Sequence, residues 1–347
     1  MRLLVYEWCC SGGLTGPDAM ALVPKAASAS DLEPLTREGR AMFRAALCDG
    51  CRSADLEIHA VVDATRPLAL PAGVRVHAVA AGDELPALVA MAHGCDLALI
   101  IAPETGGILA ARVAAVRAVG IEVLAPGPRF LSLAADKQAT VLALAAAGLP
   151  VPPGRRLAAG EHWPTEFHRP AIGKRLDGVG CDGLVRVGRG DPWPAPANHP
   201  LRIEAAVGGL SVGVSCLTGG GQIIPLRPML QRFSAGNSPG YIGGEPIDHD
   251  SLCRRATRLA LRSVAAVEWA AGEPACGWVG VDMILGPRED GSEDRVLEIN
   301  PRLTTSFLGH AAAANTSLLA WLAAPQAAAR PNLPDPRSFD VVADAPA

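Results

Sequence analysis

The sequence predicts an α/β fold in its amino-terminal third and an α+β arrangement with antiparallel strands further on. Short apolar runs alternate with helix-like stretches over the first third of the chain, which is the rhythm of a parallel sheet covered on both faces. From residue 170 to residue 226 the apolar runs are short and broken by glycines, which indicates antiparallel strands and turns. A chain of 347 residues is long enough for two or three packed units.

The amino-terminal unit is predicted to consist of parallel strands connected by helices. Its strand candidates are short apolar runs, at residues 3–6, 59–62, 74–77, 97–101 and 121–124. Its helix candidates are residues 36–48, 85–93 and 108–119. A cluster of two prolines and a glycine follows at residues 126–128, and such a cluster interrupts regular structure. We therefore assign residues 1–128 to the first domain.

Two further units and a tail are expected after this boundary. A helix capped by Ser132 is predicted to run to Gly148, where prolines at 150, 152 and 153 prevent its continuation. A long helix is expected from about residue 250 to 269, followed by two strands at 278–285 and 295–299. We assign residues 129–205 to a central unit, 206–325 to a carboxy-terminal unit, and the proline-rich residues 326–347 to a solvated tail.

Composition excludes several classes of protein. Hydrophobic residues make up 49% of the chain and charged ones 19%, which fits a globular protein. The net charge of -4 and the scattered arginines offer no basic surface for nucleic acid. No apolar run approaches the roughly 20 residues that span a bilayer, and the start lacks a signal segment, so we expect a cytoplasmic protein. The sequence is compatible with a homo-oligomer.

Nine cysteines without a regular framework indicate reduced thiols. Cys48 and Cys51 form one C-x-x-C pair. A redox or metal role for this pair competes with free thiols, and it lacks the second ligand pair of a structural zinc site.

Three oxygen-bearing side chains are predicted to converge on the late strands. Glu298 and Asn300 are two positions apart, so they face the same side of their strand, and Asp282 lies inside the preceding strand. Magnesium prefers oxygen ligands and is often shared between carboxylates and phosphates, which favours a triphosphate site over a zinc site. The alternative is that Asp282 and Glu298 are charges at the ends of two hairpin strands. The apolar residues around them argue for burial, and buried carboxylates need partners.

This segment resembles the carboxy-terminal signature of ATP-grasp enzymes. More closely, the chain resembles the tyramine-glutamate ligase group of methanofuran biosynthesis and its relatives in methylotrophic bacteria. The resemblance covers about residues 1 to 322 and rests on several segments: Leu297 to Ser306, Gly280-Val-Asp282, Val5-Tyr-Glu7 with Gly12-Gly13-Leu14, Ala102 to Gly107, Ala135-Asp-Lys137, and Tyr241 to Gly244. It implies a Rossmann-like pre-ATP-grasp domain, a small central lid subdomain and a carboxy-terminal antiparallel-sheet domain.

The resemblance also implies roles for single residues. Asp282, Glu298 and Asn300 match ligands of Mg²⁺ or Mn²⁺, and Arg302 matches the arginine that steadies phosphate and the acyl-phosphate. Lys137 matches the first lysine that contacts ATP. From the residues alone, a surface lysine on an alanine-rich helix is the favoured interpretation of Lys137.

A second nucleotide element is predicted around the glycine-rich turn after residue 173. Lys174 matches the second nucleotide-contacting lysine, and Asp177, Gly178 and Gly180 match the flexible flap over phosphate. Without the resemblance, such a turn is most simply a hairpin. Glu204 resembles the hinge residue that holds adenine or ribose, although Ala205 replaces the usual bulky residue, and a strand-end glutamate is the alternative.

The substrate residues are predicted with less support from spacing. The candidates are hydroxyl, acidic, arginine and tyrosine side chains near the metal strands or at strand ends, namely Thr304, Thr305, Ser306, Arg227, Tyr241, Glu7 and Glu104. Turn formation, helix capping and surface positions are the simpler explanations for several of them. Trp8 and Phe307 are the aromatic positions expected to stack on a phenol.

The predicted function is an ATP-dependent ligase. A substrate carboxylate accepts the γ-phosphate to form an acyl-phosphate, and an amine then displaces phosphate to form an amide. The resemblance implies small-molecule substrates, the γ-carboxyl of L-glutamate and tyramine or a similar amine. Two alternatives stay open: a different ATP-grasp ligation, and a non-catalytic ATP-binding regulatory protein.

Overall fold

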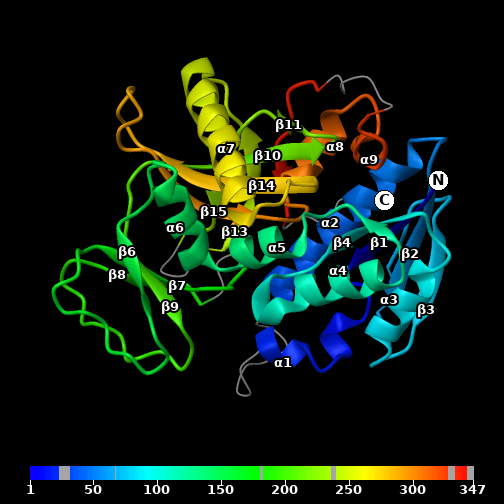
Figure 1. Ribbon diagram of the computed structural model, residues 1–347, viewed down its shortest axis with the longest axis horizontal. Helices are drawn as coiled ribbons and strands as arrows, with labels where there is room; N and C mark the ends of the chain where they lie inside the picture. Colours follow the sequence, from blue (N-terminus) through cyan, green and yellow to red (C-terminus); the bar gives the residue numbers. More distant parts are fainter. Residues whose placement is uncertain (23–31, 67, 180–182, 236–239, 327–332, 342–347) are drawn as a thin grey trace.

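The computed structural model describes residues 1–22, 32–66, 68–179, 183–235, 240–326 and 333–341. Three sheets follow one another across the molecule. In Figure 1 the parallel amino-terminal sheet lies at the right, a small four-stranded sheet lies at the left, and a seven-stranded sheet lies between them. The mixed α/β class and the antiparallel character of the later sheets are confirmed.

The amino-terminal sheet is parallel, with strand order β3-β2-β1-β4-β5. Its strands are β1 (Arg2–Glu7), β2 (Glu57–Asp63), β3 (Arg75–Val79), β4 (Leu97–Ile101) and β5 (Glu122–Val123). Its helices are α1 (Ala19–Leu22), α2 (Glu33–Cys51), α3 (Glu84–Ala92) and α4 (Ile108–Ala118). Alternation along β1 explains the two covered faces. Leu3 and Val5 pack with Phe43 of α2, whereas Leu4 and Tyr6 join the core under α3 and α4.

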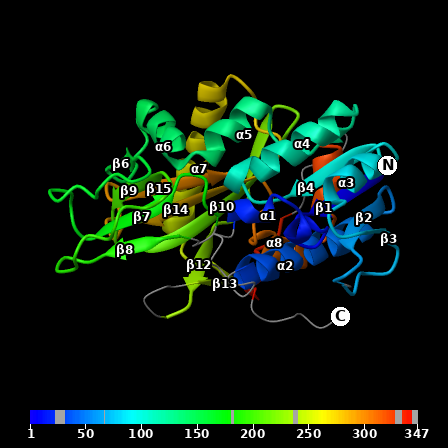
Figure 2. The ribbon, with the colours of Figure 1, turned by 90° about the horizontal axis from the view of Figure 1, so that it is seen from below.

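Helix α2 is longer than the predicted segment 36–48. Buried residues recur along it every three or four positions, from Thr36 to Gly50, which is the pattern of a helix with one apolar face. Pro34 lies in its first turn, where the missing N–H costs nothing. The apolar face of α2 packs against the last helices of the chain, as Figure 2 shows.

The single helix predicted from Ser132 to Gly148 is two helices in the structure, α5 (Pro128–Ala135) and α6 (Lys137–Ala146). Asp136 separates them with an extended backbone, and its Oδ1 accepts hydrogen bonds from the N–H groups of Gln138 and Ala139. The cap is therefore Asp136 and not Ser132, which lies inside α5. An aspartate that satisfies the free N–H groups ends one helix and begins the next.

The small central sheet is antiparallel, with order β6-β9-β7-β8. It consists of β6 (Gly154–Leu157), β7 (Ala171–Arg175), β8 (Val185–Val187) and β9 (Leu201–Ala205). Its own core includes Trp163 and Ile203. The Trp163 ring lies so close to Gly173 that a Cβ there would come within 2.3 Å of it, so the strand that carries Lys174 needs glycine at this position.

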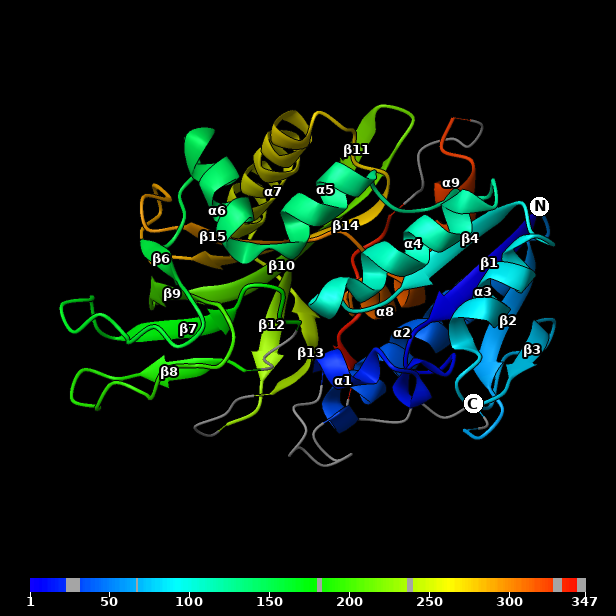
Figure 3. The ribbon, with the colours of Figure 1, turned by 60° about the horizontal axis from the view of Figure 1, so that its bottom comes forward.

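The carboxy-terminal sheet has the order β15-β14-β10-β12-β13-β16, with β11 beside β10. Its strands are β10 (Leu210–Gly219), β11 (Gln222–Pro225), β12 (Met229–Phe233), β13 (Tyr241–Pro246), β14 (Gly277–Leu285), β15 (Arg295–Asn300) and β16 (Phe339–Asp340). The long helix α7 (Asp250–Ala271) covers one face together with α5 and α6, as Figure 3 shows. Helices α8 (Phe307–Ala313) and α9 (Leu318–Ala323) pack toward the amino-terminal domain.

The expectation of a solvated tail is wrong for residues 339–341, whereas four of the five residues 334–338 are exposed. Strand β16 pairs with β13, and Val341 is buried. Strand β13 would otherwise present an unpaired edge, and β16 takes up its free backbone groups. Among the helices of the described segments, none is long and apolar enough to cross a bilayer. The boundaries at residues 128, 205 and 325 stay predictions.

Candidate active site

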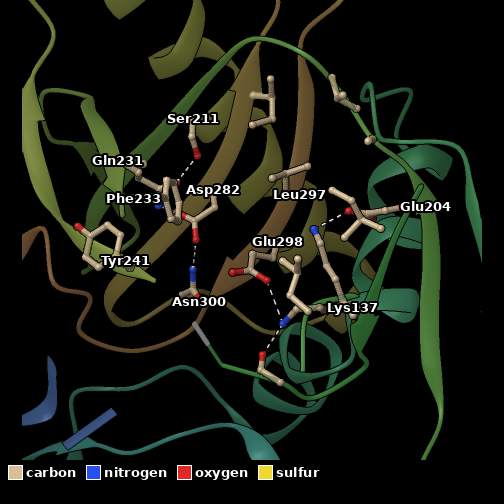
Figure 4. A pocket seen from close by; sticks show the side chains of 18 of the residues that line it. Lys137, Glu204, Ser211, Gln231, Phe233, Tyr241, Asp282, Leu297, Glu298 and Asn300 are labelled. Atoms are coloured by element: carbon tan, nitrogen blue, oxygen red, sulfur yellow. Dashed lines mark hydrogen bonds and ion pairs between the residues drawn. The ribbon is translucent and has the colours of Figure 1, made fainter. Parts of the chain in front are cut away.

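A cavity of about 740 Å³ is lined by the central sheet, the carboxy-terminal sheet, Lys137 of α6 and Glu38 of α2. Most of the residues predicted for the site line this cavity: Lys137, Lys174, Gly178, Glu204, Tyr241, Asp282, Glu298, Asn300, Arg302, Thr304, Thr305 and Ser306. In the close view of Figure 4, Asp282, Glu298 and Asn300 lie in the middle. Lys137 and Glu204 lie on one side of them, and Gln231, Phe233 and Tyr241 on the other.

The hairpin β14–β15 brings the three predicted metal ligands together. Asp282 is the Cα partner of Glu298 in the antiparallel register. The Asn300 Nδ2 atom donates to Asp282 Oδ2 at 2.9 Å. A second donor, Gln231 Nε2 on β12, lies 2.8 Å from Asp282 Oδ1. The two carboxyl groups therefore face the same cavity from neighbouring strands, as the sequence predicted.

The two predicted nucleotide lysines lie against acidic groups of the same cavity. Lys137 is the first residue of α6, and its Nζ lies 2.9 Å from Glu298 Oε2 and 2.6 Å from the Gly178 carbonyl oxygen. Lys174 on β7 places its Nζ 2.5 Å from Glu204 Oε1 on β9. Both ammonium groups are thus held at the cavity wall without being buried as unpaired charges.

The two carboxyl groups of the hairpin titrate in opposite directions. Burial, followed by the charge of Glu298, raises the pKa of Asp282 to about 7. Burial alone would also raise the pKa of Glu298, but the ammonium groups of Lys137 and Lys174 lower it to about 2. One hairpin carboxylate is therefore compensated by the lysines, while the other accepts hydrogen bonds from two amide groups and its pKa is lowered only weakly by the charge of Arg302.

The donor set fits a hard divalent cation. The set has two carboxylates and one amide. Within the described segments, no group of three or more histidine, cysteine, aspartate or glutamate side chains could hold a metal ion by itself. A cation here would bind the two carboxylates and the amide oxygen of Asn300, with the amide turned over, and would need phosphate oxygens or water to complete its shell. Magnesium is usually bound in this way, by one or two carboxylates and substrate phosphates.

Arg302 connects the hairpin to the amino-terminal domain. Its Nε lies 3.0 Å from Glu104 Oε1, and both side chains are largely buried. Burial by itself would lower the pKa of Arg302, but Glu104 raises it. The sequence placed Glu104 at the end of β4 as a substrate residue. In the structure this carboxylate forms an ion pair with Arg302. Glu104 also lines a second cavity, of about 410 Å³.

The predicted flap lies against the amino-terminal domain. Asp177 Oδ2 accepts a hydrogen bond from Gly106 N at 2.9 Å, and the Asp177 carbonyl accepts one from Thr105 Oγ1 at 2.7 Å. Asp177 lines the second cavity and is not among the residues that line the larger one. Gly180 lies outside the described residues.

Three predicted substrate hydroxyls line the cavity beyond Arg302. Thr304 and Ser306 form a cluster with Ser215 of β10, in which Ser215 Oγ lies 2.7 Å from Ser306 Oγ and Thr304 Oγ1 lies 2.9 Å from Ser306 Oγ. Thr304 Oγ1 also accepts from Trp278 Nε1 at 3.0 Å. Burial raises the pKa of Tyr241, and a hydrogen bond with Thr305 partly offsets this increase.

Two other substrate candidates are placed away from the cavity. The Arg227 guanidinium binds Asp335 and the Ile247 carbonyl and does not line the cavity. Glu7 is buried and accepts from the N–H groups of Cys9 and Cys10, beside Gly39. Glu7 therefore stabilises the turn after β1, which differs both from the predicted substrate contact and from a helix cap.

The two aromatic residues expected to stack on a substrate are in the core. Trp8 and Phe307 are fully buried, and Phe307 packs edge-on against Trp278. The aromatic rings that do line the cavity are Phe233 and Tyr241, in edge-to-face contact at 5.8 Å. The sequence does not distinguish an aromatic ring that fills the core from one at a cavity wall, because both can have apolar neighbours.

Sequence reasoning missed Glu38, Ser215 and Gln231, all of which line the cavity. A serine in a strand and a charged residue in an amphipathic helix carry no distinctive local pattern. One signal did exist for the lysines. Lysine is rare in this chain: of the 31 lysines and arginines, three are lysines, and two of these three are Lys137 and Lys174. Cys48 and Cys51 are free thiols on α2, the first exposed and the second half-buried.

Two family models match the sequence. A model described as an ATP-grasp domain matches residues 134–306, and one described as a pre ATP-grasp 3 domain matches residues 57–129. None of the curated proteins compared with the sequence matches it.

Solved structures with the same fold are similar over most of the chain. A structure from Archaeoglobus fulgidus described as an ATP-grasp superfamily protein is 22% identical, with 93% of this chain and 88% of that chain covered and a TM-score of 0.67. The N5-carboxyaminoimidazole ribonucleotide synthetase of Thermotoga maritima is 17% identical, covering 91% and 72%, with a TM-score of 0.57. The D-alanine–D-alanine ligase of Bacillus anthracis in complex with ATP is 17% identical, covering 87% and 86%, with a TM-score of 0.54. At these identities the likeness establishes the fold.

Proposed function

Because the chain belongs to the ATP-grasp superfamily, we propose that it is a ligase that uses ATP to join a carboxylate to an amine. One observation carries this proposal. Two lysines from different elements, two carboxylates of one hairpin and Arg302 all line a single cavity. Cations that can contact phosphate, next to oxygen ligands for a divalent metal, form the charge arrangement that phosphoryl transfer requires.

In this proposal the nucleotide occupies the end of the cavity formed by the central sheet. Lys137 and Lys174 offer compact positive charges to the phosphates, and Glu204 beside Lys174 contacts the adenosine part. Asp282, Glu298 and Asn300 hold Mg²⁺ or Mn²⁺, which would neutralise charge on the phosphates and on the transferred group. Gly178, which lines the cavity and accepts a hydrogen bond from Lys137, belongs to the predicted flap, and closure of this flap over the phosphates would exclude water.

The acid and the amine occupy the other end. Arg302 orients the substrate carboxylate, and the hydroxyl cluster of Ser215, Thr304 and Ser306 supplies hydrogen bonds to it. A carboxylate oxygen attacks the γ-phosphorus and ADP leaves. The amine nitrogen then attacks the carbonyl carbon of the acyl-phosphate, the C–O bond to phosphate breaks, and an amide and inorganic phosphate remain.

The finer proposal is γ-glutamylation of tyramine or a similar amine, as in methanofuran biosynthesis. It is supported by the sequence resemblance described above and by the aromatic pair Phe233 and Tyr241 at the wall of the cavity. Aromatic rings at 4.5 to 7 Å attract one another beyond the effect of simple burial. A phenol ring next to these two side chains would therefore gain affinity.

The test is ADP release by the purified protein with Mg²⁺ and ATP, measured against a panel of amino acids with and without tyramine. The proposal expects ADP release that requires an acid and an amide product that requires an amine. Turnover with acids other than glutamate would retain the ligase and reject the glutamate assignment. ATP binding without ADP release under any combination would favour a regulatory ATP-binding protein.

A further inference from the structure

Among the residues that the structure describes, Glu38 is the acidic group of the cavity without a hydrogen bond or ion pair. Five acidic side chains line the cavity: Glu38, Asp191, Glu204, Asp282 and Glu298. Each of the other four accepts a hydrogen bond or forms an ion pair. In the described part of the chain, Glu38 has neither. A half-buried carboxylate with no partner in a ligand cavity is an unfilled position for a positively charged group.

Helix α2 fixes the position of Glu38 relative to the hairpin. Eleven residues after Glu38, Asp49 accepts hydrogen bonds from Ser317 Oγ, Leu318 N and Leu319 N at the start of α9. Eleven residues are close to three turns, so Glu38 and Asp49 lie on the same face of the helix. The face that is bound to the carboxy-terminal subdomain through Asp49 therefore also presents Glu38 to the cavity. Among the described residues before α5, Glu38 is the one that lines it.

The electrostatic neighbours of Glu38 belong to the substrate end of the cavity. The charged and titratable groups that face it are Arg37 on its own helix, Arg302 after β15 and Tyr241 on β13. In Figure 4, Tyr241 lies on the opposite side of Asp282 and Glu298 from Lys137 and Glu204. Glu38 is thus near the arginine proposed for the acyl group.

We propose that Glu38 receives the ammonium group of the amine substrate and takes its proton, so that the free amine can attack the acyl-phosphate. The assignment rests on the ligase function proposed above. In the reaction, the Glu38 carboxylate accepts one proton from R-NH₃⁺. The amine nitrogen forms the C–N bond, the C–O bond to phosphate breaks, and the second nitrogen proton leaves with the phosphate. Glu38 then releases its proton to solvent.

The acidity of Glu38 suits this exchange. Burial raises the pKa of Glu38 to about 7, against the opposing charges of Arg302 and Arg37. A general base works best when its pKa is near the operating pH. An ammonium beside the carboxylate would also form a direct ion pair, which neither Arg302 nor Arg37 forms with Glu38, so binding and proton transfer use the same contact.

The experiment compares amide formation with hydroxamate formation in wild type and Glu38→Gln. L-Glutamate is the first acid tested, followed by other amino acids, and the nucleophile is either tyramine or hydroxylamine. Hydroxylamine is largely uncharged at neutral pH, so it traps an acyl-phosphate without a base. We expect E38Q to lose at least about 100-fold in kcat/KM for the amine, the usual contribution of a general base, and to keep hydroxamate formation. E38D should recover part of the loss.

A pH profile and a matched control variant separate a base from a structural role. In wild type, kcat/KM for the amine should fall as the pH drops through about 7, because Glu38 becomes protonated, and E38Q should lack this fall. Glu33→Gln is the matched control, since Glu33 is an exposed glutamate in the first turn of the same helix. It should behave as wild type in both reactions.

The outcomes distinguish the two proposals. Equal losses of amide and hydroxamate in E38Q would mean that Glu38 positions Arg302 for the acid, which overturns the base assignment. Unchanged amide formation in E38Q would overturn it as well. If wild type forms no hydroxamate with any acid, the ligase function itself is wrong and the role of Glu38 falls with it.

Discussion

The Nζ atom of Lys137, the first residue of α6, lies 2.9 Å from Oε2 of Glu298 on β15. This ion pair joins the residue that begins a helix to a carboxylate that faces its partner Asp282 across the hairpin. Lys137 therefore contributes to the low pKa of Glu298, whereas the pKa of the neighbouring Asp282 is raised. Together with Asp282, the pair places one positive and two potentially negative groups where a metal–nucleotide complex is proposed to bind.

Replacement of Glu298 by Gln is expected to abolish ADP formation. The change keeps the size of the side chain but removes a charged oxygen ligand, so kcat should fall by at least about 100-fold, as for other groups that stabilise charge in the transition state. Steady-state ADP release measures the effect, and urea unfolding checks the fold. Glu289→Gln, an exposed change in the turn before β15, is the control. Undiminished turnover in E298Q would refute the metal assignment.

Replacement of Lys137 or Lys174 by Arg is expected to weaken ATP binding although the charge is kept. Both ammonium groups contact an acid at 2.9 Å or less in confined positions, and a planar guanidinium needs more room and a different geometry. Titration calorimetry with Mg-ATP should show Kd values at least about tenfold higher, equal to about 1.4 kcal/mol. Arg155→Lys on the exposed strand β6 should leave Kd as in wild type. An unchanged Kd in both lysine variants would place the phosphates elsewhere.

Replacement of Asp177 by Ala is expected to uncouple ATP consumption from ligation. Asp177 accepts from Gly106 N at 2.9 Å and holds the flap against the amino-terminal domain. Without this contact the flap should open more often, and water should reach the acyl-phosphate. The measured quantity is the ratio of ADP to amide, which should rise above one. Glu161→Ala removes a carboxylate that contacts Arg155 on β6 and Ala158 just after it, and its ratio should match wild type. A D177A ratio near one would argue against a flap that excludes water.

His310 is expected to make the fold less stable at acidic pH. Burial lowers the pKa of His310 to about 3, and its Nε2 has no hydrogen-bond partner within the described segments. Below the ordinary pKa of about 6.5, the unfolded chain binds a proton that the folded chain does not, so stability falls as the pH decreases. At pH 5 this group alone should cost about 2 kcal/mol relative to neutral pH.

The check is urea unfolding of wild type and His310→Phe at pH 7.5 and pH 5. Phenylalanine fills a similar volume beside Trp278 and cannot bind a proton. The loss of unfolding free energy between the two pH values should be smaller in H310F by about that amount. His93→Gln, at an exposed position, controls for the loss of a histidine in general. Equal losses in wild type and H310F would mean that His310 gains a partner in solution.

The alternating apolar runs of the first third determined the parallel sheet, because a strand buried on both faces must be apolar throughout. The strand spacing also determined the hairpin, since Glu298 and Asn300 share a face by the geometry of any strand. The glycine next to Lys174 and the proline cluster at residues 126–128 could likewise be recognised from the sequence. These features are local, so the sequence alone was sufficient for them.

The tertiary structure decided what depends on distant segments. The partner of Arg302 is Glu104, which lies nearly two hundred positions away in the sequence. Arg227 donates a hydrogen bond to Asp335, which is also distant in the sequence. Glu38 reaches the cavity because α2 packs on the last helices of the chain, and β16 exists because β13 has an edge to pair with. Trp8 and Phe307 became core residues for the same reason. A side chain's local pattern specifies its chemistry, whereas its counter-charge and its exposure are set by segments that only the folded chain brings together.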